Sequence, residues 1–216
     1  MTQQLILPFA PRLNFKAEDF FVSPCNQEAF LLVQNDTKWP IKMLCLYGEK
    51  GSGKTHLAHL FSDNIIKAKD LTLADIPLFK FRTVLEDIDE TKDETILFHA
   101  FNYAKENGLC LLMTARQQPL FKLPDLKSRI ASVVSVKIHA PDDDLIRSIL
   151  CKLFSDRQIA VEADVIGYLL THMERTYETL RLVVEKVDKL SFEKKKKITI
   201  PLLKEALSEI QNERLL

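Results

Sequence analysis

The chain has 216 residues, a hydrophobic fraction of 46% and a formal net charge of zero, with 30 basic and 30 acidic residues. This composition is typical of a globular protein with one large domain, or a medium domain with a small appendage. The balanced charge argues against bulk electrostatic attraction to nucleic acid or to an anionic membrane, and leaves only local patches. No apolar run approaches the roughly 20 residues of a membrane span.

Targeting and redox features indicate a cytoplasmic protein. The apolar stretch at residues 5–10 follows no positive charge, is short for a signal-peptide core and precedes no cleavage site. The four cysteines lie far apart, and no cluster of histidines accompanies them. We therefore expect neither a disulfide framework nor a zinc site, and we expect a reducing compartment.

Short apolar, β-prone runs predict buried strands in the first two thirds of the chain. They lie at residues 43–47, 81–85, 109–114 and 133–138, with a weaker run at 64–67. The runs do not alternate apolar with polar residues, which is typical of a parallel sheet covered on both faces. Helices are expected at 53–63 and at 94–107, the latter ended by Gly108. Strands that alternate with helices predict an α/β fold.

The pattern changes after residue 138. Residues 139–142 form a breaker, and Asp142 is expected to cap a helix. Four helices and no strand are then expected, at 143–157, 162–173, 177–192 and 200–212. The predicted organisation is therefore an N-terminal peptide at residues 1–12, an α/β domain at 13–139 and a small all-α domain at 140–216.

A complete P-loop pattern lies between the first expected strand and the helix after it: Gly48-Glu49-Lys50-Gly51-Ser52-Gly53-Lys54-Thr55. Glycines let consecutive backbone N–H groups converge on phosphate oxygens, and the start of the next helix adds its dipole. Lys54 would supply a positive charge to the β- and γ-phosphates, while Thr55 would offer a hydroxyl to Mg²⁺. The motif predicts a site for ATP or ADP with Mg²⁺.

Glu86 and Asp87 follow the next strong strand and are candidates for organising Mg²⁺ and the attacking water. A solvated acidic turn is the alternative, because Asp89 and Glu90 continue the acidic run. The usual order places Asp at the metal and Glu at the water, and here it is reversed. A shorter side chain at the base position would misplace the water, so we expect at most weak ATPase activity.

Two further residues occupy positions of interest. Thr114 ends an expected strand, where a polar group would be able to sense the γ-phosphate. Arg129 lies just before the last strand of the sheet, although an isolated arginine is more often a surface residue.

Residues 194–197 are four lysines in the expected loop between the last two helices. This run is either a solvated loop extended by its own repulsion or a patch that contacts phosphates.

Taken together, these motifs resemble the AAA+ ATPases, and within them the replication initiator DnaA and its shortened homologue Hda. The segments that carry the resemblance are Gly51-Ser52-Gly53-Lys54-Thr55-His56-Leu57, Asp19-Phe20-Phe21-Val22 with Asn26, and Ser128-Arg129. The resemblance implies an AAA+ P-loop NTPase with a parallel five-stranded sheet flanked by helices, followed by an all-α lid. Because the chain ends after the lid, we expect no helix-turn-helix DNA-binding domain, which favours the Hda type.

The resemblance implies roles for individual residues. Phe21 and Val22 would lie against the adenine, and Arg129 would be an arginine finger that reaches the nucleotide of a neighbouring subunit. Glu178 occupies the place of the lid's sensor arginine, and Arg181 would substitute for it from one turn later. The nucleotide-binding set is then Phe21, Val22, Gly48, Lys50, Gly51, Ser52, Gly53, Lys54, Thr55, His56 and Arg181, and the Mg²⁺ set is Thr55, Glu86 and Asp87.

The N-terminus is similar to the short peptide by which Hda docks on the DNA sliding clamp. Its residues are Gln4, Leu5, Leu7, Pro8 and Phe9, in which Gln4 would form hydrogen bonds while Leu7 and Phe9 fill apolar pockets. The alternative is a strand that packs on the protein's own core. The implied partners are the sliding clamp (beta) and DnaA, with a homo-oligomer possible in principle and no sequence-specific DNA binding. The implied location is the bacterial cytoplasm, at the replisome or nucleoid.

Three functions are therefore compared. The first is a clamp-bound, ADP-holding regulator that presents Arg129 to ATP held by DnaA and so stops initiation. The second is a free-standing AAA+ ATPase that loads or remodels a DNA-bound partner, which the reversed Glu86-Asp87 order disfavours. The third is a DNA-binding adaptor that uses the lysine run, which the zero net charge disfavours. The stretch between Thr55 and Glu86 is also much shorter than in DnaA, which leaves little room for a second full helix and further argues against autonomous hydrolysis.

Overall fold

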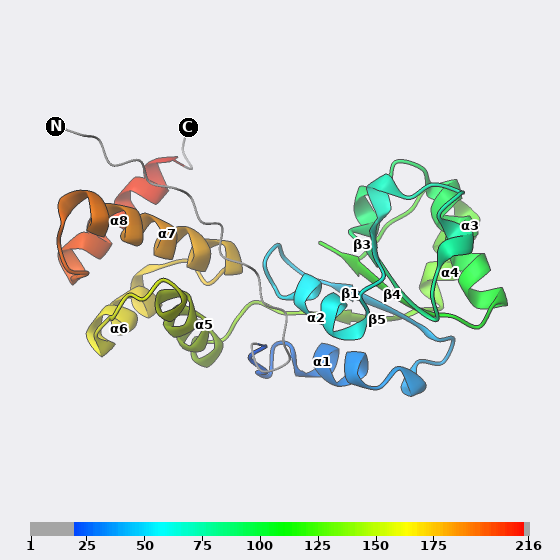
Figure 1. Ribbon diagram of the computed structural model, residues 1–216, viewed down its shortest axis with the longest axis horizontal. Coiled ribbons are helices and arrows are strands. Elements are labelled where there is room, and N and C mark those ends of the chain that lie inside the picture. The colour runs from blue at the N-terminus through cyan, green and yellow to red at the C-terminus, as the bar shows by residue number, and fades with distance from the viewer. Residues whose placement is uncertain (1–19, 214–216) are drawn as a thin grey trace.

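A parallel sheet of five strands, in the order β2-β3-β4-β1-β5, forms the centre of the first domain (Figure 1). The computed structural model describes residues 20–213. The strands are β1 (Met43–Tyr47), β2 (Ile65–Lys67), β3 (Arg82–Glu86), β4 (Cys110–Ala115) and β5 (Val134–Lys137). Because all five strands run in the same direction, their carboxyl ends meet at one edge, where ligands bind in such folds.

Helices cover both faces of the sheet. Two lie on one face, α1 (Gln27–Gln34) and α2 (Lys54–Phe61), and two on the other, α3 (Glu94–Glu106) and α4 (Pro124–Ala131). The short 3₁₀ helices are η2 (Asp36–Lys38), η3 (Ala68–Asp70), η4 (Ile76–Leu78) and η5 (Ile88–Glu90). The first domain is therefore a three-layer sandwich with one apolar core on each side of the sheet.

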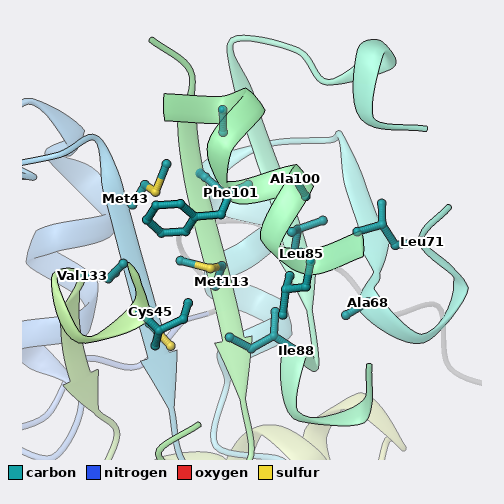
Figure 2. Packing of buried hydrophobic residues seen from close by; sticks show 14 of the residues in the cluster. Met43, Cys45, Ala68, Leu71, Leu85, Ile88, Ala100, Phe101, Met113 and Val133 are labelled. Atoms are coloured by element: carbon teal, nitrogen blue, oxygen red, sulfur yellow. The ribbon is translucent and has the colours of Figure 1, made fainter. Parts of the chain in front are cut away.

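The two cores follow from the pleat of the central strands, in which successive side chains point to opposite faces. Met43 and Cys45 of β1 enter the core under α3 and α4, whereas Leu44 and Leu46 enter the core under α1 and α2. Figure 2 shows the first of these cores, with Phe101 of α3 lying over the sheet. Burial raises the pKa of the Cys45 thiol to about 12, so this cysteine behaves as a small apolar residue.

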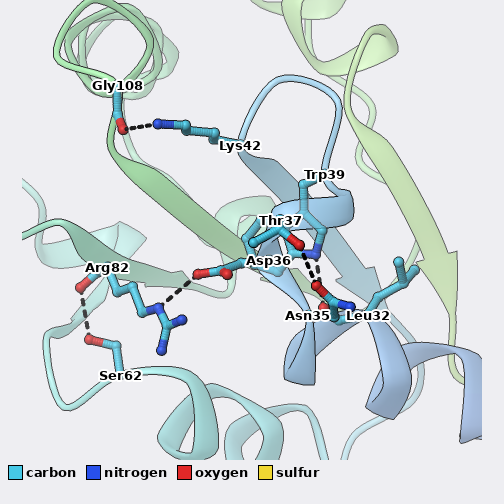
Figure 3. Close-up of polar contacts among 9 residues, drawn as sticks. All are labelled: Leu32, Asn35, Asp36, Thr37, Trp39, Lys42, Ser62, Arg82 and Gly108. Atoms are coloured by element: carbon cyan, nitrogen blue, oxygen red, sulfur yellow. Dashed lines mark hydrogen bonds and ion pairs between the residues drawn. The ribbon is translucent and has the colours of Figure 1, made fainter.

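The amino ends of the strands are held together by polar contacts (Figure 3). Arg82 Nε donates to Asp36 Oδ2 at 2.8 Å, and Lys42 Nζ donates to the Gly108 carbonyl oxygen at 3.1 Å. Trp39 Nε1 donates to the Leu32 carbonyl oxygen at 2.9 Å. These contacts brace the edge opposite the P-loop, so they support the site from behind.

The second domain is a bundle of α5 (Asp143–Asp156), α6 (Ala163–His172), α7 (Tyr177–Lys194) and α8 (Ile200–Glu213). Its apolar core is separate from the two cores of the sandwich. Asp142 caps α5 by accepting the Leu145 N–H at 2.8 Å, and Thr176 caps α7 by accepting the Thr179 N–H at 3.1 Å. Figure 1 shows this bundle beside the carboxyl edge of the sheet, joined to β5 by a single connection.

The predicted fold class is confirmed: a parallel five-stranded sheet flanked by helices and followed by an all-α bundle. The expected strands and helices all form, with ends shifted by a few residues, and Gly108 follows α3 with φ +62°. Helices α1 and α4 were not among the expected elements. Between α2 and β3 the structure contains β2 and two 3₁₀ helices, in line with the short spacing noted in the sequence. Among residues 20–213, no helix is both long and apolar enough to cross a membrane.

Candidate functional site

The P-loop joins β1 to α2 at the carboxyl edge of the sheet. Gly51 and Gly53 have φ values of +85° and +94°, a region that glycine adopts without strain. A Cβ at Gly53 would lie 2.9 Å from Cε2 of Phe20, so this glycine also allows an aromatic ring to approach the backbone. Helix α2 begins immediately afterwards at Lys54, and its free N–H groups face the loop.

Lys54 is nearly buried and lies folded over the P-loop. Its Nζ donates to the carbonyl oxygens of Gly48 at 2.6 Å and Glu49 at 2.8 Å, and lies 3.5 Å from Ser52 Oγ. Burial lowers the pKa of the Lys54 ammonium, and the negative charge of Asp87 opposes this shift. Charge-assisted hydrogen bonds to a phosphate would offset the cost of burying this ammonium. The position of Lys54 therefore suits an anionic ligand.

The acidic strand end lies beside the P-loop. Glu86 is the last residue of β3 and is buried, while Asp87 follows with φ +53° in the left-handed region. Thr114 of β4 is also buried, and its Oγ1 accepts the Asp87 N–H at 3.1 Å. Thr114 therefore braces the acidic turn. Burial raises the pKa of the Asp87 carboxyl, and the nearby charges of Glu86 and Glu90 raise it further.

The donor set suits a Mg²⁺ ion that is also held by phosphates. No group of three or more His, Cys, Asp or Glu residues within 20–213 is arranged to hold a metal ion by itself. Mg²⁺ in P-loop sites takes few protein ligands and keeps water and phosphate oxygens, so a hydroxyl and a carboxylate are sufficient. Thr55 is exposed at the start of α2 and Asp87 is half-buried, and both would be available to such an ion.

An apolar cavity of about 150 Å³ lies on one side of the P-loop. Phe20 forms part of its wall, stacked on Phe30 at 5.5 Å and edge-on to His56 at 5.3 Å between ring centroids. Buried Asn26 donates to the Phe21 carbonyl oxygen at 2.9 Å, which fixes the turn that carries both phenylalanines. The lining residues are Phe20, Phe21, Asn26, Gly51, Ser52, Gly53, His56, Leu145, Ile149, Lys152, Leu153, Tyr177 and Arg181.

The helical domain closes this cavity through Tyr177, the first residue of α7. A Cβ at Gly51 would lie 3.0 Å from Cβ of Tyr177, so the lid helix lies directly against the P-loop. The Tyr177 hydroxyl donates to the His139 carbonyl oxygen at 3.4 Å and lies 3.6 Å from Cys25 Sγ. Burial raises the pKa of Tyr177, which keeps its hydroxyl protonated. The tyrosine therefore ties the P-loop, the interdomain connection and the lid together.

A charged cleft lies on the other side of the P-loop. Lys50 Nζ is 3.6 Å from Glu178 Oε1, and the Arg116 guanidinium pairs with Glu90. The cleft is lined by five acidic and two basic residues together with Gln117 and Thr176; the charged ones are Glu49, Lys50, Asp89, Glu90, Arg116, Glu174 and Glu178. The two basic side chains are engaged in ion pairs, so the cleft is acidic in balance.

The structure brings most of the predicted nucleotide-binding residues to the two sides of the P-loop. Phe21, Gly51, Ser52, Gly53, His56 and Arg181 line the apolar cavity, and Lys50 lines the charged cleft. Val22 lines neither and is 46% exposed. Gly48 packs closely on the connection after β5, because a Cβ there would lie 2.7 Å from the Ile138 carbonyl oxygen.

Arg129 lies in the last turn of α4 and is half-buried. It lines neither cavity, and its guanidinium forms no hydrogen bond or ion pair with another residue of the 20–213 range. The predicted clamp-binding residues Gln4, Leu5, Leu7, Pro8 and Phe9 lie outside the described residues.

Sequence reasoning missed the lid's contribution to the cavity. Leu145, Ile149, Lys152 and Leu153 of α5 and Tyr177 of α7 line it, and none was named from the sequence. Phe20 was noted in the resemblance but not among the binding residues. The amphipathic pattern of α5 indicated an apolar face, but a pattern does not say which part of that face is left over for a ligand.

Comparisons with known proteins agree with this architecture. The helical domain matches the family described as Hda, lid domain, over residues 142–207. An uncharacterised protein of Haemophilus influenzae is 27% identical over 231 residues, which span 96% of this chain and the whole of that protein. The chromosomal replication initiator DnaA of Buchnera aphidicola is 25% identical over 203 residues, 79% of this chain. The chain spans only 46% of the length of that DnaA.

Solved structures show the same fold. Domain III of the Thermotoga maritima replication initiation protein DnaA superposes with a TM-score of 0.75 at 19% identity, over 90% of this chain and 96% of that one. AMPPCP-bound DnaA from Aquifex aeolicus superposes with a TM-score of 0.62 at 20% identity, over 82% of this chain and 65% of that one. The chain therefore shares its fold with domain III of DnaA, is similar to DnaA in sequence, and has a helical domain that matches the Hda lid family.

Proposed function

We propose that this protein is an ADP-holding regulator of replication initiation that stimulates ATP hydrolysis on DnaA. The observation that carries the proposal is a contrast between the residues that would bind a nucleotide and the residues that would hydrolyse it. The residues that would hold a nucleotide, here called the nucleotide grip, lie together at the P-loop. In contrast, the acidic strand end has the reversed Glu86-Asp87 order, and Arg129 has no described partner within its own chain. Such a protein would bind a nucleotide to stabilise its own structure, and it would act on the nucleotide of a partner.

The grip consists of the P-loop, Lys54 and the apolar cavity. The cavity has aromatic walls on one side and α5 on the other, which suits a flat purine base. Arg181 enters the same cavity from the lid, where it would contact a phosphate or the ribose. AMPPCP-bound DnaA shares this fold, which supports an adenine nucleotide as the ligand. Mg²⁺ would be held by Thr55 and Asp87 together with the phosphates, where it would neutralise phosphate charge.

Two features favour ADP over ATP and disfavour hydrolysis. The charged cleft flanks the P-loop residues Glu49 and Lys50, and its acidic balance would repel the added charge of a γ-phosphate. The acidic turn offers buried Glu86 first and the shorter Asp87 second, so neither carboxylate would hold water at the usual place. The Thr114 hydroxyl oxygen accepts the Asp87 N–H and so braces this turn.

Arg129 is proposed to act in trans. It lies in the last turn of the short helix α4, and α4 packs on α3 at the surface of the sandwich. An arginine supplied by a neighbouring subunit stabilises charge in phosphoryl transfer and changes rates by about 10³–10⁵-fold. The proposed partner is DnaA, because the chain is similar to DnaA in sequence and in fold. ATP bound to DnaA would become ADP, and initiation would stop.

The clamp-binding role rests on the sequence of residues 4–9. Gln4 would form directional hydrogen bonds, and Leu7 and Phe9 would fill apolar pockets on the sliding clamp. Docking there would confine the regulator to replicated DNA. This would raise its effective concentration near DnaA without any new contact to DnaA itself.

The test is the ATPase rate of the cognate DnaA, mixed with this protein and with clamp-loaded DNA. Wild type should accelerate hydrolysis, and Arg129→Ala should lose the acceleration by about 10³-fold or to the background rate. Lys127→Ala, an exposed change on the same helix, is the matched control and should retain it. A Gln4/Leu7/Phe9 alanine variant should fail on clamp-loaded DNA.

The alternative function, a free-standing AAA+ ATPase, gives a different result in the same experiment. The protein alone would then hydrolyse ATP, and DnaA would be indifferent to it. Loss of that intrinsic activity in Glu86→Gln or Asp87→Asn would complete the case against the regulator. If the Arg129→Ala variant stimulated DnaA as strongly as wild type does, Arg129 would not be the arginine finger.

A further inference from the structure

The connection between α7 and α8 is a defined turn that presents lysines. Helix α7 ends at Lys194, and the turn is closed by two contacts between Ser191 and Lys196. Ser191 Oγ donates to the Lys196 carbonyl oxygen at 2.7 Å, and the Lys196 N–H donates to the Ser191 carbonyl oxygen at 3.1 Å. We call Phe192, Lys195, Lys196 and Lys197 the basic tip. The two contacts order the backbone from which these side chains project.

The acidic residues nearest in sequence to the basic tip are already engaged. Glu193 pairs with Lys189 at 3.9 Å, and Glu205 pairs with Lys194. Glu209 pairs with Lys186 at 2.7 Å, and that ammonium holds the pKa of the Glu209 carboxyl below its usual range. Lys195, Lys196 and Lys197 are exposed and have no described carboxylate within ion-pair distance. Three positive charges therefore remain uncompensated on a chain whose net charge is zero.

The backbone of Lys195 adds a second observation. This residue has φ +51° and ψ +41°, the left-handed conformation that ends helices and that glycine or asparagine adopts most easily. The corresponding turn after α3 uses Gly108. Lysine pays a small backbone cost at this position that glycine would not, so Lys195→Gly offers a variant that removes the charge without disfavouring the turn.

An aromatic side chain accompanies the charges. Phe192 is 61% exposed, and its carbonyl oxygen accepts the Lys195 N–H at 3.3 Å, so the two residues are neighbours in the turn. Exposed lysines and an exposed aromatic ring on one short turn are a combination that proteins use to bind single-stranded nucleic acid. The charges follow the phosphates and the ring stacks on a base, whatever its identity.

We propose that the basic tip binds single-stranded nucleic acid without sequence preference. The site is separate from the nucleotide-binding cavity, because α7 begins beside the P-loop and its 18 residues span ~27 Å at 1.5 Å per residue. Figure 1 shows the α7–α8 connection at the end of the lid away from the sheet. Nucleic acid on the basic tip would therefore leave the cavity, the charged cleft and Arg129 uncovered, and the proposal does not depend on the proposed function.

The test is fluorescence anisotropy with labelled oligothymidine and with a duplex of equal length, over a range of salt. The K195A/K196A/K197A variant should lose about 10–100-fold in affinity for the single strand. The slope of log K against log salt should fall by about 2, because each single-strand phosphate contact contributes about 0.7. Phe192→Ala should weaken single-strand binding about tenfold with the slope unchanged.

Two controls separate binding from folding. K69A/K80A/K92A removes three exposed lysines from the α/β domain and should leave the affinity and the slope unchanged. Lys195→Gly removes one charge and relieves the left-handed backbone, so it should weaken binding while its melting temperature stays the same or rises. An unchanged salt slope in the triple variant would overturn the proposal. Equal binding of duplex with no effect of Phe192→Ala would overturn the assignment to single strands.

Discussion

The two sides of the P-loop differ in chemistry. On one side, Phe20, Phe21 and the apolar face of α5 form a cavity with aromatic and aliphatic walls. On the other side, a cleft is lined by five carboxylates and by two basic residues that are already paired. The first side suits a neutral, flat base, whereas the second opposes additional negative charge.

This difference separates binding from turnover. In the proposed function, the apolar cavity would hold the base and the P-loop's backbone donors would hold its first phosphates, and neither task needs a catalytic water. Hydrolysis requires charge stabilisation at the terminal phosphate, which an acidic cleft does not supply. On the proposed function, the nucleotide would serve as a structural element, while the proposed arginine finger, Arg129, lies elsewhere, on α4.

The largest effect on nucleotide affinity is expected at Lys54, which lies in the P-loop between the apolar cavity and the charged cleft. Lys54→Ala should weaken ADP and ATP binding by ~100-fold or more, because the ammonium would form charge-assisted hydrogen bonds to phosphate. Isothermal titration calorimetry measures both affinities. Lys50→Ala removes an exposed lysine of the same loop and should cost much less. Equal losses in the two variants would show that the loop responds to total charge rather than to the position of Lys54.

The apolar side is tested by Phe20→Ala. Loss of the ring that contacts Phe30 and His56 should weaken ADP and ATP equally, by about tenfold, because a buried aromatic wall contributes about 1–2 kcal/mol of contact. The ratio of the two affinities should not change. Val22→Ala is the matched control, since Val22 is 46% exposed and lines neither cavity. A larger effect at Val22 than at Phe20 would restore the role that the resemblance gave to Val22.

The sequence predicted the sandwich well because its signals are local. Buried strands, the P-loop and the caps at Gly108 and Asp142 each depend on a few neighbouring residues. Helix α4 was missed because it has only eight residues and begins at a proline. A proline in a sequence can mark either the end of a helix or its first turn. Helix α1 was missed because it is equally short and buries only Ala29 and Val33.

The site was predicted only where one segment forms it. The P-loop residues were identified from their spacing, but the cavity needs α5 and α7 to lie against that loop. Their placement depends on contacts such as the one between Tyr177 and Gly51, which lie 126 positions apart in the sequence (177 minus 51). Glu178 was noted as a departure from the family pattern, but its pairing with Lys50 follows from the position of the lid.

The charged side is tested by Glu178→Gln, which removes one carboxylate from the cleft and releases Lys50. The ratio of ATP to ADP affinity should shift toward ATP by about fivefold, the scale of one charge pair near a protein surface. Glu185→Gln, on the same helix but outside the cleft, should leave the ratio unchanged. Competition binding with both nucleotides measures the shift. A constant ratio would mean that the acidic cleft does not select the nucleotide, even if Arg129 acts as proposed.

The smallest expected effect is on stability, at the half-buried Asp87. Its pKa is raised in the folded state, so ionisation disfavours folding, and stability is lost as pH rises from the unfolded value through the folded one. Asp87→Asn should therefore raise the melting temperature of the nucleotide-free protein by about 1–2 °C near pH 7, with the difference disappearing toward pH 4. Asp93 gives the opposite sign, because the Thr95 N–H lowers the pKa of its carboxyl. Ionised Asp93 contributes stability above the unfolded pKa, and this contribution is lost as pH falls. If Asp87→Asn lowered the melting temperature at pH 7, its carboxylate would be stabilised by the P-loop side, and the acidic side would be less unfavourable than the cleft indicates.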